Sequence, residues 1–116
     1  MAARHRVREA LPIGVFDSGL GGLTVARQIR HFLPHEDILY LGDTARVPYG
    51  TRSAETVIKY ALGCSRVLHD RGVKAIVVAC NTVSAVALDM MRIELDLHVL
   101  GVILPGARAA IAAANG

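Results

Sequence analysis

The sequence predicts an α/β fold: an open, mostly parallel sheet flanked by helices. Short apolar runs alternate along the chain with segments of helical periodicity. The run at residues 75–79 is continuously apolar and rich in β-branched residues, which is typical of a parallel strand buried on both faces. Hydrophobic residues make up 53% of the 116 residues and aromatic residues only 4%, so the core of this single domain should be aliphatic. Strands separated by helices pair in parallel through right-handed crossovers.

The first strand and helix follow a basic tail, residues 1–11, which we expect to be flexible. Residues 13–16 form an apolar run that ends at Asp17, and residues 23–33 show helical spacing that Pro34 stops. One side of this helix should be apolar, formed by Leu23, Ala26, Ile29 and Leu33.

The second strand and its connection lie in the middle of the chain. Residues 37–41 predict the strand, and residues 44–53 predict a polar loop. A long helix should then cover residues 53–71, with Ser53 as its N-cap and Gly72 as its end.

The last elements complete a β-α-β-α-β-α-β-α order. After the buried run come a helix at residues 82–95, a fourth strand at residues 98–103 and the start of a helix at residues 105–114. In open parallel sheets, ligands bind beyond the carboxyl ends of the strands. The residues that follow each strand are therefore the candidates for a site.

The three strand ends carry small or polar residues. Asp17 and Ser18 open a glycine-rich turn through Gly22, Gly42-Asp43 precede a Pro48-Tyr49-Gly50 loop, and Cys80, Asn81 and Thr82 follow the third strand. This set suits a small, polar, zwitterionic ligand. The glycine-rich turn alone is a weak signal, because it lacks the Lys of a phosphate-binding loop and the third glycine of a dinucleotide fingerprint. A plain tight turn is the alternative.

Cys80 is the stronger candidate, because a thiol between a buried strand and a helix N-terminus is stabilised as thiolate by the helix dipole. The alternative is a small hydrophobic residue that finishes a core strand. Asn81 and Thr82 have the alternative role of helix caps, and Asp43, Arg46 and Tyr49 that of a surface loop.

Other classes of site and partner find little support. Cys64 lies inside the long helix, where packing is the expected role, and no Cys64–Cys80 disulfide is expected in a chain of cytoplasmic type. The five histidines are scattered, so no metal site is predicted. A net charge of +3 without a basic stripe or stacking aromatics argues against nucleic-acid binding. No apolar stretch approaches the ~20 residues that span a membrane.

The motifs together resemble the glutamate racemases of the aspartate/glutamate racemase family. The resemblance is carried by residues 13–19 and 21–25, by Tyr40 through Gly50 (YLGDTARVPYG), by residues 79–82 (ACNT) and by residues 105–108 (PGAR). It covers residues 12 to 114 with the motifs in the family's order and spacing.

The resemblance implies a cofactor-free enzyme that interconverts L- and D-glutamate and supplies D-glutamate for bacterial peptidoglycan. Two cysteines on opposite sides of the α-carbon transfer the proton, and Cys80 matches the first. Asp17 matches a position that both binds substrate and assists the thiol. The other substrate-binding positions match Ser18, Tyr49, Gly50, Asn81 and Thr82.

The sequence departs from the family because it has no Gly-Cys-Thr-His motif, which in the family carries the second cysteine on a second lobe. We therefore expect residues 12–104 to be the first lobe, residues 105–116 to begin a truncated second lobe, and this chain alone to be inactive. It is expected to be part of a longer protein. The alternatives are a homo-oligomer or a second chain that supplies the missing C-terminal half, a related enzyme acting on aspartate, hydantoins or maleate, and a non-catalytic binding remnant.

Overall fold

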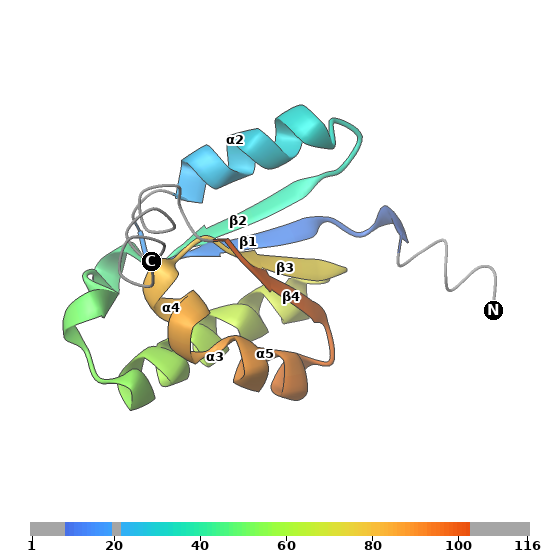
Figure 1. The fold of residues 1–116 in the computed structure, drawn as a ribbon. Coiled ribbons are helices and arrows are strands. Elements are labelled where there is room, and N and C mark those ends of the chain that lie inside the picture. Colours follow the sequence, from blue (N-terminus) through green and yellow to red (C-terminus); the bar gives the residue numbers. More distant parts are fainter. Residues whose placement is uncertain (1–8, 20–21, 103–116) are drawn as a thin grey trace, which may run out of the picture.

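A four-stranded parallel sheet forms the centre of the molecule (Figure 1). The computed structural model describes residues 9–19 and 22–102. The strands lie in the order β2-β1-β3-β4, and every neighbouring pair is parallel. Their bounds are Ile13–Asp17 (β1), Ile38–Gly42 (β2), Ala75–Val78 (β3) and His98–Gly101 (β4). The predicted open parallel sheet is confirmed.

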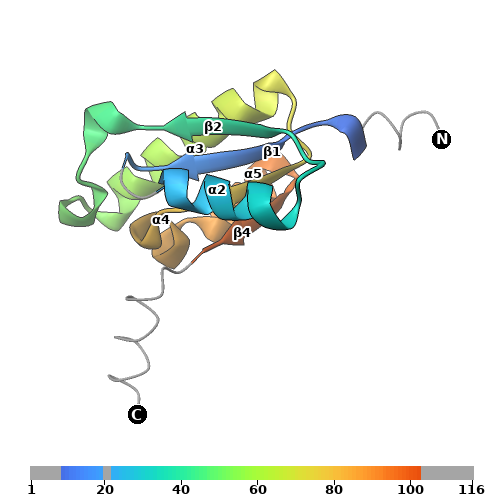
Figure 2. The same cartoon turned by 90° about the horizontal axis from the view of Figure 1, so that it is seen from above.

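Helices cover both faces of this sheet. Helix α2 (Gly22–Phe32) lies on one face, and α3 (Ala54–Arg71), α4 (Asn81–Val86) and α5 (Leu88–Leu95) lie on the other (Figures 1 and 2). The larger core cluster lies on the face of the three helices and includes Phe16, Leu68, Ile76, Val83 and Met91, whose side chains are buried. A smaller cluster under α2 contains Val15, Val25 and Ala79.

The ends of α3 were predicted correctly. The Ser53 hydroxyl accepts a hydrogen bond from the Thr56 backbone N–H at 3.2 Å, which satisfies one of the unpaired donors of the first turn. Gly72 ends the helix with a φ of 87°, a conformation that glycine adopts without a steric penalty.

Two helix predictions are wrong in detail. The single helix expected at residues 82–95 is two helices, because the backbone of Ala87 leaves helical geometry with a φ of −120°. On α2, Leu23 is 60% exposed, and the buried residues are Gly22, Val25 and Ala26. The buried side of α2 is thus rotated from the one that the leucine spacing indicated, toward the side on which Val25 packs with Val15 and Ala79.

The polar loop and the third strand also differ from expectation. The loop contains two short 3-10 turns, η1 (Thr44–Arg46) and η2 (Tyr49–Thr51). In β3, Ile76 and Val78 are buried, whereas Ala75 and Val77 are only partly covered. The strand is therefore buried more deeply on the face of the three helices, where Ile76 and Val78 join the larger cluster, than on the α2 face, where Val77 packs against the smaller one. An apolar cavity of about 520 Å³ remains beside α2, lined by Val25, Ile29, Phe32, Leu33 and Val102 among others.

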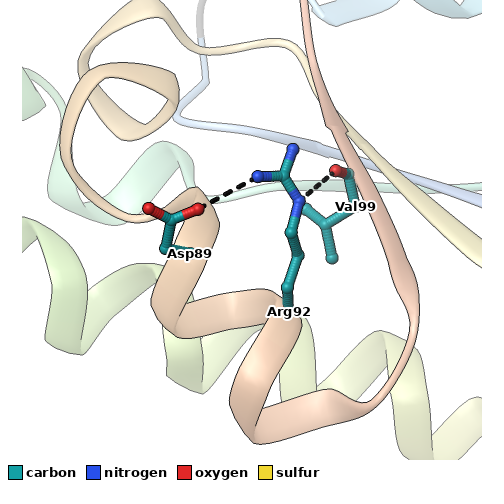
Figure 3. Close-up of polar contacts among 3 residues, drawn as sticks. All are labelled: Asp89, Arg92 and Val99. Atoms are coloured by element: carbon teal, nitrogen blue, oxygen red, sulfur yellow. Dashed lines mark hydrogen bonds and ion pairs between the residues drawn. The ribbon is translucent and has the colours of Figure 1, made fainter.

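Polar contacts fix α5 against the edge strand. Arg92 donates from Nε to the Val99 carbonyl at 3.0 Å and pairs through Nη1 with Asp89 at 3.1 Å (Figure 3). The fourth strand ends at Gly101, and Val102 follows it outside the strand. Ile103, the helix expected from Pro105 and most of the expected N-terminal tail lie outside the described residues.

Candidate active site

The carboxyl ends of β1, β2 and β3 meet at one edge of the sheet. The Asp43 backbone N–H donates to the Asp17 carbonyl at 2.9 Å, and the Ala79 N–H donates to the Phe16 carbonyl at 2.8 Å. These bonds carry the parallel register past the ends of the strands. They bring together three of the candidate segments, which begin at Asp17, Asp43 and Cys80.

Asp17 is the last residue of β1 and has no exposed surface. Its Oδ2 accepts hydrogen bonds from the Gly22 backbone N–H at 3.0 Å and from the Tyr40 hydroxyl at 2.9 Å. Its Oδ1 is buried and has no hydrogen-bond partner among residues 9–19 and 22–102. Because an unpaired buried acceptor is costly, this oxygen is a candidate to accept a hydrogen bond from a ligand.

Cys80 is a free thiol, 7% exposed, at the N-cap position of α4. Its extended backbone joins β3 to the helix, and its carbonyl accepts a hydrogen bond from the Ser84 N–H. The thiol also packs against the larger core cluster, so both the catalytic and the packing interpretations fit its position. Asn81 and Thr82 lie inside the first turn, so the cap interpretation of these two residues is wrong.

Tyr49 and Gly50 occupy η2, and they face different surroundings. Tyr49 is 2% exposed, with its ring 6.3 Å from that of Phe16, so the surface-loop interpretation is wrong for this residue. Its hydroxyl donates to the Asp43 carboxylate. A Cβ atom built on Gly50 would lie 3.7 Å from Thr82 Oγ1, which places the Gly50 backbone beside α4. Tyr49 thus anchors the turn, and Gly50 reaches the site.

Arg46 forms an ion pair with Asp43 and stacks on a neighbouring ring. Arg46 Nε lies 3.6 Å from Asp43 Oδ2, and the Arg46 guanidinium lies 4.4 Å from the centre of the Tyr60 ring. The Tyr60 ring in turn packs 5.6 Å from that of Tyr49. The hydrogen bond, the ion pair and the ring contacts together fix the whole loop between β2 and α3.

The surroundings of Cys64 disfavour its thiolate form. Burial, and then the nearby Asp43 carboxylate, raise the pKa of Cys64 to about 11, so this thiol is protonated at neutral pH. Burial and the hydrogen bond to Asp43 also raise the pKa of Tyr49. These directions support the packing role predicted for Cys64.

We expect the raised pKa values to make the fold less stable in alkali. The pKa of Tyr40 is raised to about 12, by burial and then by its hydrogen bond to Asp17, and that of Cys64 to about 11. Their ordinary values are 10.0 and 9.0, so the unfolded chain releases these protons first. The contribution of these two groups to the free energy of unfolding should therefore be complete below pH 9 and should be lost as the pH rises toward 12.

Urea unfolding monitored across this pH range tests the expectation. Cys64→Ser should remove the part of the decline that begins near pH 9 and should leave the Tyr40 part in place. Stability that rises with pH, or an identical slope in the serine variant, would contradict it.

The contribution of Tyr40 to the site was not predicted, and Asp43 was named only among the residues that follow the second strand. The hydroxyl of Tyr40 and the carboxylate of Asp43 both act on candidate residues from β2 and its end. The alternation of β2, which places Tyr40 and Gly42 on the same face, is the available signal, but it becomes informative only when β2 is known to adjoin β1.

Among residues 9–19 and 22–102, no three His, Cys, Asp or Glu side chains gather where they could hold a metal ion. None of the helices in this part of the chain has the length and apolar character needed to cross a bilayer.

In a comparison with known protein families, residues 22–116 match the Asp/Glu/hydantoin racemase family. The glutamate racemase of Geobacter metallireducens is 57% identical over 100 residues, which are 86% of this chain and 37% of that protein. The solved glutamate racemase of Aquifex pyrophilus is 55% identical, with a TM-score of 0.79 over 88% of this chain and 40% of that one.

A further solved structure is the glutamate racemase of Francisella tularensis in complex with D-glutamate. It is 48% identical, with a TM-score of 0.76 over 79% of this chain and 35% of that one. The chain thus spans about two fifths of the length of the relatives that it matches.

Proposed function

Because this chain belongs to the Asp/Glu/hydantoin racemase family, we propose that it forms the part of a glutamate racemase that carries one of two catalytic thiols. The observation that carries the proposal is the meeting of Asp17 and Cys80 at one sheet edge, with an unpartnered carboxylate oxygen. The similar proteins named above are glutamate racemases, and one of them binds D-glutamate. Residues 12–104 would be the first lobe, and residues 105–116 would begin the second.

In the proposed reaction, Cys80 as thiolate removes the α-proton of glutamate on one side. A thiol from outside these 116 residues returns a proton on the opposite side. No bond to carbon other than C–H is broken, so the reaction is an exchange of one proton with inversion. The α-proton of an amino acid is very weakly acidic, so hydrogen bonds fixed in advance must stabilise the carbanion-like state.

The chain offers such groups around Cys80. Asp17 Oδ1 would accept a hydrogen bond from the substrate ammonium group, which keeps the amino acid oriented. Ser18, which is 7% exposed, would donate to the substrate, as would Thr82 beside the Gly50 backbone. Asn81 and Tyr49 are the remaining residues of the proposed site. Tyr49 would hold the turn through Asp43 and would not touch the ligand. In a bacterium, such an activity would supply D-glutamate for peptidoglycan in the cytoplasm.

Isotope exchange tests the proposal. The 116 residues would replace the equivalent N-terminal part of the Aquifex pyrophilus racemase, which gives a hybrid protein with both thiols. Incubation with D-glutamate in deuterated water should place deuterium at the α-carbon and produce L-glutamate. The 116-residue chain alone should not racemise, because only Cys64 and Cys80 are present and Cys64 lies inside α3.

The outcome separates the alternatives. A hybrid that acts on aspartate, a hydantoin or maleate instead would assign the same proton-transfer chemistry to another substrate. A folded hybrid that binds glutamate without exchange would indicate a binding module and would contradict the proposal.

A further inference from the structure

Tyr40 contacts the buried carboxylate from a neighbouring strand. Along β2, Tyr40 is opposite Val15 of β1, and Gly42 is opposite Asp17. Tyr40 and Asp17 are therefore diagonal neighbours on the same face, a separation that an aromatic side chain can span. The Tyr40 hydroxyl lies 2.9 Å from Asp17 Oδ2.

Gly42 makes room for this contact. A Cβ atom at Gly42 would lie 3.0 Å from the Tyr40 hydroxyl oxygen, so a larger residue would crowd it. Tyr40 as a whole is 36% exposed, whereas its hydroxyl reaches the fully buried Asp17. The side chain thus contributes its polar end to the site rather than a large share of the core.

The two oxygens of Asp17 are used differently. Oδ2 has two donors, the Tyr40 hydroxyl and the Gly22 N–H, which approach from β2 and from the start of α2. Two donors from separate elements fix the rotamer of the carboxylate. Oδ1 is then held in one position as the unpartnered acceptor.

We propose that Tyr40 is a positioning residue of the reaction, which holds Asp17 so that Oδ1 meets the ammonium group of an amino-acid substrate. This role rests on the proposed function. It adds to the site a residue that need not touch the substrate. The contact can be tested without catalysis, so the two proposals can fail separately.

The first measurement uses the 116-residue chain at neutral pH. With aspartate carboxyl groups labelled with ¹³C, the Asp17 signal is identified by its loss in Asp17→Asn. Tyr40→Phe should shift this signal, because it removes a donor to Oδ2 and keeps the ring. Tyr60→Phe is the matched control, because among residues 9–19 and 22–102 the Tyr60 hydroxyl makes no hydrogen bond to Asp17. Its loss should leave the Asp17 signal in place. An unmoved Asp17 signal in Tyr40→Phe would overturn the inference.

The second measurement uses the hybrid protein. Loss of one hydrogen bond to a charged group should lower kcat about tenfold in Tyr40→Phe, with KM changed much less, since substrate still binds while Oδ1 is held less firmly. Tyr60→Phe should keep the wild-type kcat. Unchanged kcat in Tyr40→Phe, or a lower kcat without a shift of the Asp17 signal, would overturn the role. A wild-type hybrid that fails to exchange the α-proton would refute the proposed function, while the carboxyl signal would still decide the contact.

Discussion

Cys80→Ala should reduce α-proton exchange by the hybrid protein about 10²- to 10⁴-fold, the range that a positioned acid–base group contributes. The thiol leaves β3 at the sheet edge where Asp17 lies, and its small exposed surface limits access by water. The loss of buried sulfur is a small change in volume, so the variant should fold. Deuterium at the α-carbon of D-glutamate, followed by NMR, measures the effect.

Cys64→Ser is the matched control for this prediction. Cys64 is the other thiol of the chain, and its pKa is raised to about 11, so it is protonated at neutral pH. Its replacement should leave exchange near the wild-type rate. Exchange that survives in Cys80→Ala, or that disappears in Cys64→Ser with the fold intact, would move the catalytic assignment away from Cys80.

Gly22→Ala should destabilise the chain by about 1–3 kcal/mol, the usual cost of forcing an extra carbon into a filled space. A Cβ atom at Gly22 would lie 2.4 Å from Asp17 Cβ and 2.6 Å from Asp17 Oδ2. Asp17 is fully buried and cannot turn away, so either α2 or the carboxylate must shift. The same shift should weaken exchange in the hybrid, because the Gly22 N–H is one of the two donors to Asp17.

Gly63→Ala should increase the stability of the chain, in contrast to Gly22→Ala. Gly63 lies inside α3, and a Cβ atom there meets no atom within 4 Å. Alanine should therefore stabilise the chain by roughly 0.5–1 kcal/mol, because glycine is unfavourable in a helix interior. Urea unfolding of the 116-residue chain measures both variants. Equal stability of Gly22→Ala and the wild type would show that the turn before α2 is loosely packed.

Local chemistry determined much of the fold in advance. The alternation of apolar runs with helical spacing predicted the four strands, and Ser53 and Gly72 marked the ends of α3 because capping depends on a few neighbouring atoms. The division of the expected helix at Ala87 and the exposure of Leu23 were not predictable in this way. Both depend on which elements lie opposite, and a helical period does not contain that information.

The candidate site was likewise predictable from the sequence only in part. The sequence by itself indicated that the candidate residues lie at or beyond the ends of parallel strands, because small and polar residues stand after apolar runs. These residues are Asp17, Ser18, Cys80, Asn81 and Thr82, with Gly50 in the loop after the second strand. Only the tertiary structure decided that β2 adjoins β1 and that Tyr40 therefore reaches Asp17. It also turned Tyr49 inward, toward Asp43 and Phe16. The physical reason is that hydrogen bonds between strands depend on sheet order and register, which are set by long-range packing rather than by neighbouring residues.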